Sequence, residues 1–445
     1  MTRLIGSYMS FQMLTLWLLE LLLSFCLAYI LLSTGSLAAG LEPLAANHAL
    51  ILAVTVGSTT FAIGLHRPEV FRRTGSMLIN TALGGLLAFP AAWLVSKAVG
   101  MDVDRLVGHD PFWPTKIIAA WIAALFAMRL LFLIAVRSNV FVRRVAVLGP
   151  ATAMAATVAA IRNGHRGFLE VVSGPIADTG PAGLRAAGVR DAVLPQSSLA
   201  AMLTGEQAGY AAEGVLLETE PRFWERCLKR VDVAHMDEAW TAALGPVRIG
   251  GLTNHVNRIR DVGISLLLLL FALPLMLIVG LLVRLESPGP VLYRQERVGL
   301  GGLPFTLLKF RSMRTDAEMR GPAWATQKDP RVTRVGSFLR RTRIDELPQL
   351  INILRGTMSF IGPRPERPHF VEQLAEVIPY YKQRVRVKPG LTGWAQVSFP
   401  YGASIEDARV KLSYDLYYVK YRSVLLDLII LFSTIRVILF QGGSR

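Results

Sequence analysis

The sequence predicts a multidomain membrane protein with a four-helix transmembrane bundle, then an α/β domain, then a mainly α domain that carries a further membrane segment. Three observations support this fold class. The chain has 445 residues, enough for several domains. Hydrophobic residues make up 52% and the mean hydropathy is +0.41, which is typical of membrane proteins. Apolar runs then give way to alternating strand and helix patterns, so we expect domains at 1–140, 141–250 and 251–445.

The charge and the cysteines narrow the class further. The formal net charge is +16 and the pI is about 10.2, which favours contact with acidic lipid or a phosphorylated substrate. Nucleic acid is the weakest candidate partner, because the basic residues mostly flank apolar segments. The 2 cysteines, Cys26 and Cys227, predict neither a disulfide framework nor a cysteine-based metal site.

Four apolar runs open the chain, each close to the roughly 20 residues that a membrane-spanning helix needs. They are about Phe11–Leu32, Ala49–Leu65, Ser76–Val99 and Lys116–Val136. The second is the shortest. The first lacks a small-residue cleavage signature, so we interpret it as an anchor rather than a signal peptide. Glu20 is the nearest thing to a mid-span acid, and it fits a helix interface as well as a transport pathway.

Loop charges predict the orientation of this bundle. The segments after the second and fourth runs carry Arg67, Arg72, Arg73, Arg137, Arg143 and Arg144. The other two loops are mainly acidic. The positive-inside rule therefore places both ends of the bundle in the cytoplasm.

Alternating short strands and helices follow from Arg144 to about Ala243. Buried-strand runs occur at 144–149, 168–172, 191–194 and 214–217. Such alternation predicts a parallel sheet covered by helices, a Rossmann-like arrangement. The first strand-to-helix turn is Gly149-Pro150, and it lacks the later glycines that let a pyrophosphate approach. We therefore expect a structural or self-association role rather than dinucleotide binding.

The strongest apolar run, Val262–Val283, has Pro274 at its middle and arginines on both flanks. Proline removes a helical hydrogen bond and clashes with the preceding turn, which forces a kink. Positive charge on both sides favours both ends in the cytoplasm. We predict a re-entrant segment broken at Pro274. A kinked fifth span is an almost equal alternative from the residues alone, and it would move the rest of the chain to the other face.

An adjacent acid pair, Asp345-Glu346, lies at the start of a predicted helix whose first turn is set by Pro348. Asp345 is expected at or next to the N-cap, where partial positive charge and free donors favour phosphate. On this stretch alone the simpler interpretation is an N-cap beside a solvated acid.

Basic residues surround the pair in sequence. Lys309 and Arg311 project to the same side of a predicted strand. Arg364 is held between two prolines and suits bidentate phosphate contact. A basic run before the pair contains Arg331, Arg334, Arg340, Arg341 and Arg343. Singly, such arginines are membrane-surface charges, whereas together they could also clamp a diphosphate.

Five motifs follow one another in the second half of the chain: KFRSM (Lys309–Met313), DELPQLINILRG (Asp345–Gly356), MSFIGPRPE (Met358–Glu366), VKPGLTGWAQV (Val387–Val397) and YDLYYV (Tyr414–Val419). In this order they resemble the bacterial sugar transferase family, the monotopic phosphoglycosyl transferases that begin exopolysaccharide, capsule or O-antigen synthesis. The resemblance covers about Ile259 to the C-terminus. The upstream half looks like the long form of the family, which includes undecaprenyl-phosphate galactose or glucose phosphotransferases.

The resemblance implies a function for each matching residue. Asp345 would be the nucleophile that attacks the sugar-bearing phosphate of a UDP-sugar, releases UMP and forms an aspartyl-phosphosugar. Polyprenyl (undecaprenyl) phosphate would then accept the phosphosugar. Glu346, with Asp345, would hold Mg²⁺. Lys309, Arg311 and Arg364 would offset phosphate charge.

Further expectations come from the same resemblance. Lys388, Trp394 and Gln396 lie in a glycine-rich loop that could seat the uridine, although Trp394 could equally be core. The break at a proline in the membrane segment is a family feature, and Leu273 stands where some members have serine. The location would be the bacterial inner membrane, with the catalytic domain on the cytoplasmic face and a homodimer as a candidate assembly.

The last apolar run of the chain is predicted to lie at the membrane surface. Val424–Phe440 is apolar but contains Asp427 and Arg436, so we expect an interfacial helix.

Two other functions are compatible with the residues. A membrane phosphatase or phosphodiesterase could use the same acid pair, and a non-catalytic membrane scaffold would not need it. No stretch of the sequence indicates which configuration of sugar hydroxyl groups the protein recognises, so galactose, glucose and N-acetylated sugars are all candidate donors.

Overall fold

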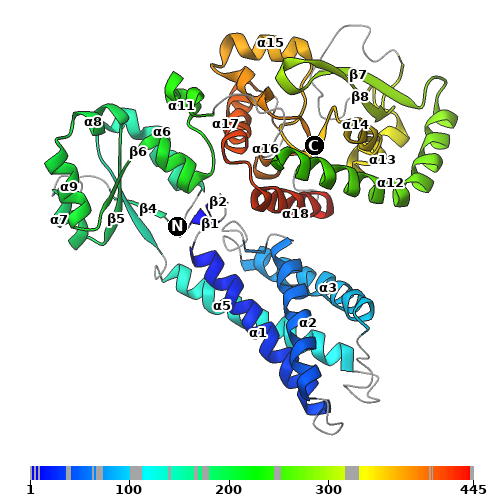
Figure 1. Ribbon diagram of the computed structural model, residues 1–445, viewed down its shortest axis with the longest axis horizontal. Helices are drawn as coiled ribbons and strands as arrows, with labels where there is room; N and C mark the ends of the chain where they lie inside the picture. The colour runs from blue at the N-terminus through cyan, green and yellow to red at the C-terminus, as the bar shows by residue number, and fades with distance from the viewer. Residues whose placement is uncertain are drawn as a thin grey trace. The chain divides into compact units, whose positions relative to one another are not determined.

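The structure is a computed structural model that describes residues 3–4, 7–8, 11–36, 42–62, 65–66, 74–100, 113–138, 142–164, 169–172, 180–244, 252–315, 330–399, 402 and 404–440. The chain forms two compact units, composed chiefly of Tyr8–Leu228 and Lys229–Arg445. The short strands β1 (Arg3–Leu4) and β2 (Ser7–Tyr8) precede them. Each unit is described by itself, with the elements labelled in Figure 1.

Long helices occupy all four positions where spans were predicted. They are α1 (Phe11–Ser36), α2 (Glu42–Ala62), α3 (Thr74–Ala98) and α5 (Trp113–Arg137), shown in blue to cyan in Figure 1. Among the described residues, α1 and α5 contain windows that are long and apolar enough to cross a membrane, at Met13–Ile30 and Ile118–Ala135. The spanning character of α2 and α3 stays a prediction.

A buried polar cluster joins these helices. Glu20 of α1 accepts hydrogen bonds from Arg129 of α5, Nε to Oε1 at 2.6 Å and Nη2 to Oε2 at 2.9 Å. His66 Nε2 lies 2.9 Å from Glu20 Oε2, and Arg129 Nη1 donates to Thr81 of α3 at 3.0 Å. Glu20 therefore lies in a helix interface, where a charged partner offsets the cost of burial.

The predicted parallel sheet is confirmed. Its strands are β3 (Arg143–Val147), β4 (Leu169–Val172), β5 (Val189–Leu194) and β6 (Leu216–Thr219), in the order β4-β3-β5-β6. Successive residues of β3 face opposite cores, since Val145 packs with Met154 and Ile161 whereas Ala146 packs with Leu184. Both faces are thus covered, as parallel sheets require.

Short helices complete this unit and the beginning of the next. They are α6 (Ala151–Gly164), α7 (Gly180–Ala186), α8 (Gln196–Ala201), α9 (Thr204–Ala212), α10 (Glu220–Phe223), η2 (Trp224–Leu228), η3 (Val233–His235) and α11 (Glu238–Ala243). At the turn after β3, Gly149 has φ +119°, and a Cβ there would lie 3.0 Å from Pro195 Cδ. The Pro195 ring thus lies against the position that a Cβ on residue 149 would occupy.

The second unit is mainly helical, as predicted. It contains α12 (Leu252–Glu286), β7 (Leu292–Val298), η4 (Leu300–Gly302), β8 (Pro304–Phe310), α13 (Arg334–Thr342), η5 (Ile344–Glu346), α14 (Gln349–Arg355), β9 (Ser359–Ile361), α15 (Pro368–Val377), η6 (Tyr381–Arg386), β10 (Gly390–Thr392), α16 (Trp394–Ser398), α17 (Ile405–Tyr421) and α18 (Val424–Phe440). Strands β7 and β8 form an antiparallel hairpin, and β9 pairs in parallel with β10.

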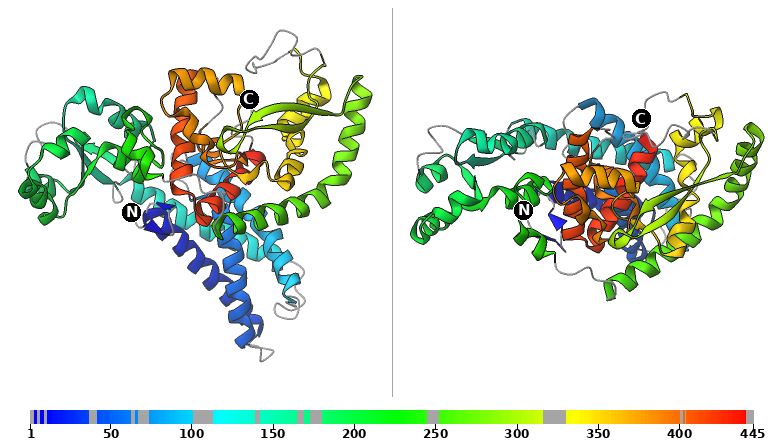
Figure 2. Two further views of the ribbon diagram at one scale, coloured as in Figure 1. Left: turned by 45° about the horizontal axis from the view of Figure 1, so that its top comes forward. Right: turned by 90° about the horizontal axis from the view of Figure 1, so that it is seen from above.

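Helix α12 continues through Pro274 and changes direction along its length, as both views of Figure 2 show. Within the described ranges it is the third helix that is apolar and long enough to cross a membrane, and only 11% of that window is buried. Exposed apolar side chains cover much of it, including Leu270, Phe271 and Leu277. Asp261 and Ser265 are instead buried. The helix therefore buries polar residues near its start and the apolar Val279 and Val283 near its end, and it exposes a broad apolar surface.

Three glycines let the turn at Gly362 pack against the loop around β10. A Cβ on Gly390 would lie 2.1 Å from the backbone nitrogen of Gly362, and a Cβ on Gly393 would lie 2.1 Å from the Gly362 oxygen. Gly362 N donates to Thr392 O and Gly390 N donates to Pro363 O, both at 2.9 Å. Because backbone meets backbone here, the glycine content of this loop has a packing cause.

We expect Gly390→Ala to destabilise the second unit by about 3 kcal/mol, because neither backbone can move away from the added methyl group. Thermal unfolding in detergent measures the change. Gly205→Ala is the matched control, since a Cβ at that α9 position meets nothing within 4 Å. Equal melting temperatures for the two variants would contradict the prediction.

Candidate active site

The acid pair lies in a 3-10 turn between two helices. Helix α13 ends at Thr342, Arg343 adopts a left-handed conformation with φ +60°, and η5 then carries Asp345 and Glu346. Helix α14 begins only at Gln349, with Pro348 as its N-cap, so the expectation that Asp345 caps this helix is wrong. The expectation of a solvated Glu346 is also wrong, since Asp345 and Glu346 are 6% and 9% exposed.

Glu346 is surrounded by positive charge. Its Oε1 atom lies 2.8 Å from Arg364 Nη2, 3.2 Å from Lys309 Nζ and 3.6 Å from Arg343 Nη1. Burial alone would raise the pKa of Glu346, but the charges of Arg364, Lys309 and Arg343 outweigh it and hold the pKa well below its usual range. Glu346 is therefore ionised throughout the neutral and mildly acidic range.

Asp345 has a different environment. Burial raises the pKa of Asp345 above its usual value and the Glu346 charge adds to this rise, while Lys309 opposes it. Among the described residues, no hydrogen bond or ion pair engages its carboxylate. Adjacent acids with opposite pKa shifts are typical of catalytic pairs whose members have separate roles.

Lys309 comes from β8 and faces the pair. Burial lowers the pKa of Lys309 below its usual value, with Glu346 acting in the opposite direction. Two strand positions beside it are held by Asn352 of α14, whose Oδ1 accepts from Leu308 N at 3.0 Å and whose Nδ2 donates to Thr306 O at 2.7 Å. Asn352 thus fixes the strand that carries Lys309 to the helix that follows the acid pair.

The sequence analysis missed Asn352 and also Arg258. Arg258 of α12 donates to the carbonyl groups of Ile353 and Leu354, both at 2.5 Å, and so caps the end of α14. The signal for Asn352 was a single amide within an otherwise apolar helix segment. No sequence pattern joins Arg258 to α14, because the two lie far apart in the chain.

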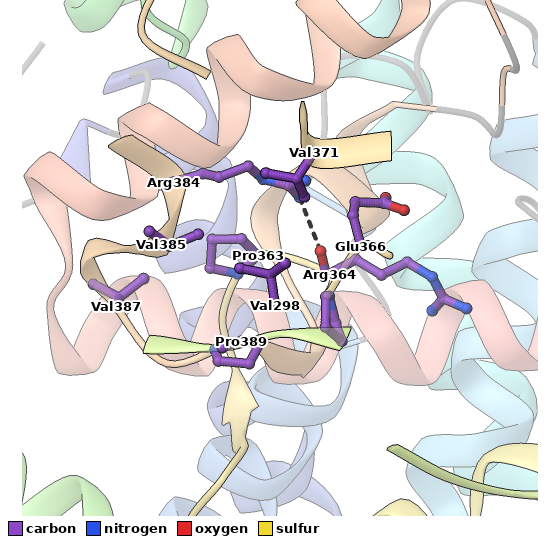
Figure 3. A pocket seen from close by; sticks show the side chains of 11 residues that line it. Val298, Pro363, Arg364, Glu366, Val371, Arg384, Val385, Val387 and Pro389 are labelled. Carbon is purple, nitrogen blue, oxygen red and sulfur yellow. Dashed lines mark hydrogen bonds between the residues drawn. The ribbon is translucent and has the colours of Figure 1, made fainter. Parts of the chain in front are cut away.

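Arg364 projects from the Gly-Pro-Arg-Pro turn toward Glu346. Figure 3 shows its side chain extending away from a small pocket beside the turn, which is lined by Val298, Pro363, Glu366, Val371, Arg384, Val385, Val387 and Pro389. Glu346 raises the pKa of Arg364 above its usual value. The structure therefore brings Lys309 and Arg364 together at Glu346, and their role in phosphate binding stays a prediction.

Arg311 has a different position from the one expected. Its buried guanidinium donates to the carbonyl groups of Pro288, Val283 and Ser287, at 2.9, 3.1 and 2.6 Å. These contacts fix the end of α12 and its following loop to β8. Residues two apart on a strand share a side, but here β8 ends at Phe310, so Arg311 lies beyond the regular pleat.

The predicted nucleotide loop is mostly engaged within the fold. Trp394 is 8% exposed, packs in the core of the second unit and donates from Nε1 to Lys229 O at 2.9 Å. Gln396 Nε2 donates to Leu391 O at 3.2 Å. Burial lowers the pKa of Lys388, and the nearby Arg258 charge adds to the effect. The core interpretation of Trp394 is confirmed.

The acid pair fits a magnesium site. Mg²⁺ prefers one or two carboxylates together with substrate phosphate oxygens. The three cations near Glu346 all approach Oε1. The carboxylate of Asp345 and the Oε2 atom of Glu346 are therefore the oxygens that this turn offers to a metal.

The family described as bacterial sugar transferase matches residues 252–441. An Aeromonas hydrophila protein named UDP-N-acetylgalactosamine-undecaprenyl-phosphate N-acetylgalactosaminephosphotransferase is 43% identical over 240 residues, 50% of this chain and 56% of that protein. The chain therefore spans just over half the length of this relative.

Two shorter relatives are covered more completely. A Caulobacter vibrioides protein named UDP-glucose:undecaprenyl-phosphate glucose-1-phosphate transferase is 44% identical over 190 residues, 42% of this chain and 71% of that protein. The exopolysaccharide production protein PSS of Rhizobium leguminosarum is 42% identical over 196 residues, 42% of this chain and 96% of that protein. The family match, at residues 252–441, lies in the second unit, which holds the acid pair.

We expect Arg311→Met to lower the stability of the second unit by about 3 kcal/mol, because it leaves buried carbonyl groups without donors. For a unit of this size that corresponds to a melting temperature lower by about 10 °C. Thermal unfolding in detergent tests this, with the exposed Arg314→Met as control. An Arg311→Met protein as stable as the control would mean that these contacts do not fix the helix end.

Proposed function

The chain belongs to the bacterial sugar transferase family, and we propose that it transfers a sugar-1-phosphate from a UDP-sugar to a polyprenyl phosphate. The observation that carries this proposal is the buried pair of acids with opposite pKa shifts, on which Lys309 and Arg364 converge. The products would be polyprenyl-diphosphate-sugar and UMP. The reaction would begin the synthesis of an exopolysaccharide, capsule or O-antigen.

Asp345 is the nucleophile in this proposal. A carboxylate oxygen of Asp345 attacks the sugar-bearing phosphorus, and the bond between that phosphorus and the bridging oxygen breaks as UMP leaves with the electron pair. A phosphate oxygen of the polyprenyl phosphate then attacks the same phosphorus and releases the Asp345 carboxylate. Its lack of partners among the described residues supports this role, because a paired carboxylate would be a weaker nucleophile.

The remaining residues bind charge. Glu346 is ionised at neutral and mildly acidic pH and, with Asp345, would hold Mg²⁺, which when bound neutralises phosphate charge and polarises the phosphoryl oxygens. Lys309 and Arg364 approach one oxygen of Glu346 from strand and turn. Their donors are already oriented before substrate arrives, so phosphate binding needs little reorganisation.

The membrane location follows the same proposal. In the part of the chain that the structure describes, three helices are long and apolar enough to cross a membrane, which supports a membrane location. A re-entrant α12 would leave the acid pair on the cytoplasmic side of the bacterial inner membrane, where UDP-sugars are present and a lipid-borne phosphate can arrive. The bend in α12 and its buried Asp261, which accepts from Ser359 Oγ at 2.7 Å, support this arrangement. In α18, Asp427 faces the protein and pairs with Arg260, which leaves apolar positions for an interfacial contact.

We expect detergent-solubilised protein with polyprenyl phosphate and Mg²⁺ to release UMP from one member of a UDP-sugar panel. The panel should include UDP-N-acetylgalactosamine and UDP-glucose, the donors in the names of two relatives. Asp345→Asn should lower the rate by at least about 10³-fold, because the amide cannot form the covalent bond.

Three outcomes would contradict this proposal. Release of inorganic phosphate without a lipid acceptor would indicate a phosphatase or phosphodiesterase. Full activity of Asp345→Asn would remove the proposed nucleophile. Absence of UMP with every donor, from folded protein, would favour a membrane scaffold.

The rate of UMP release should fall on the acid side, because only ionised Asp345 attacks and its pKa lies above the usual value. Glu346 stays ionised there, since its pKa is lowered. Lys309 holds the pKa of Asp345 down, so Lys309→Met should move the acid limb of the pH–rate profile to higher pH. An unchanged limb in this variant would mean that a different group controls the profile.

A further inference from the structure

The Gly-Pro-Arg-Pro turn is held almost entirely through its carbonyl groups. Two of its residues are prolines, which have no N–H to donate. The Pro363 carbonyl accepts from Gly390 N at 2.9 Å, and the Pro365 carbonyl accepts from Arg297 at 3.1 Å. The carbonyl of Arg364 itself accepts from Arg384 Nη2 at 2.9 Å, the contact drawn in Figure 3. The orientation of Arg364 therefore depends on a second arginine.

Arg384 is buried, and three groups fix its guanidinium. Nη2 also donates to Asp415 Oδ2 at 2.8 Å, and Nη1 donates to Tyr381 OH at 2.9 Å. The guanidinium carbon lies 5.2 Å from the centre of the Tyr381 ring. Asp415 belongs to α17 and is 2% exposed. An arginine held in this way offers a rigid donor to the turn.

We propose that the Arg384–Asp415 pair positions Arg364 for its contacts with Glu346 and with the donor diphosphate. Neither residue of the pair touches the acid pair, so both act through the turn. This inference rests on the proposed function, because it assigns to Arg364 the phosphate of a UDP-sugar. It adds two positioning residues: Arg384, which lies outside the five motifs, and Asp415, which lies in the YDLYYV motif and had no assigned role.

The charge on Asp415 makes this support dependent on pH. Burial raises the pKa of Asp415 to about 6, against the attraction of Arg384. The other charged groups that act on it are Glu366 beside the turn and Lys411 on the same helix. As pH falls through about 6, Asp415 gains a proton and Arg384 loses its ionic partner. The turn then loses part of its support, and donor affinity falls.

A purely structural pair would behave differently. Folding raises the pKa of Asp415, so the folded state favours the protonated carboxyl and gains stability from it as pH falls. Acidification should therefore leave the melting temperature unchanged or higher as far as this group is concerned. Loss of donor binding without loss of stability separates positioning from structural support.

Equilibrium binding of a UDP-sugar to full-length Asp345→Asn protein tests the inference without turnover. The probes are UDP-N-acetylgalactosamine and UDP-glucose, whose diphosphates are diesters and lack the second ionisation near pH 6 of a phosphomonoester. We expect affinity to fall about tenfold between pH 7.5 and pH 5. Adding Asp415→Asn should weaken binding at pH 7.5 by a similar factor and remove the pH dependence.

Asp427→Asn is the matched control. Asp427 pairs with Arg260 and accepts from Tyr418 OH at 2.8 Å, so it repeats the Arg-Asp-Tyr chemistry away from the Arg364 carbonyl. In the Asp345→Asn background it should keep the pH dependence of donor binding. Loss of that dependence in the control would overturn the inference.

Two further results would also overturn it. One is unchanged donor affinity after Asp415→Asn, and the other is affinity that is independent of pH in the Asp345→Asn protein. If Asp415→Asn fails to fold, Tyr381→Phe replaces it, and unaltered binding by that variant counts against the inference. A wild-type protein that neither binds UDP-sugars nor releases UMP would instead refute the proposed function.

Discussion

The site depends on one buried carboxylate. Glu346 would be costly to bury alone, and Lys309, Arg343 and Arg364 offset that cost from three different segments. Each segment must therefore be fixed with respect to the others. Asn352 joins strand β8 to helix α14, glycine contacts seat the Gly-Pro-Arg-Pro turn, and the left-handed Arg343 turns the chain between α13 and η5. Much of the polar architecture of the second unit serves this single convergence.

The same convergence separates the two acids chemically. Glu346 takes the cations and stays ionised, whereas Asp345 remains buried and unpaired among the described residues. Neither environment would exist if the pair lay on an exposed helix end. A 3-10 turn between two helices places neighbouring carboxylates in different surroundings, which a regular helix start would not do.

The sequence predicted the features that follow from local pattern. Apolar runs located the long helices, alternating runs located the parallel sheet, and the motifs identified Asp345, Glu346, Lys309 and Arg364. The sequence did not predict contacts between segments that lie far apart in the chain. Arg311 was expected at the acid pair because of strand alternation, but β8 ends one residue before it. The Arg311 guanidinium instead binds carbonyl groups of a segment that is distant in the sequence. Trp394 was a candidate for seating the uridine, with the core as the alternative, and it lies in the core while the glycines around it serve backbone packing.

Two arginines connect α12 to the site at opposite ends. Arg258 of α12 binds the carbonyl end of α14, and Arg311 beyond β8 binds the carbonyl end of α12. These hydrogen bonds thereby fix the position of the acid pair relative to α12. In the proposed reaction one reactant is dissolved and the other is lipid-borne and stays in the bilayer. Their encounter would therefore require the acid pair to lie at a fixed distance from the membrane. In this chain, hydrogen bonds to helix ends fix the acid pair relative to α12, and under the proposed function they would also fix its distance from the membrane.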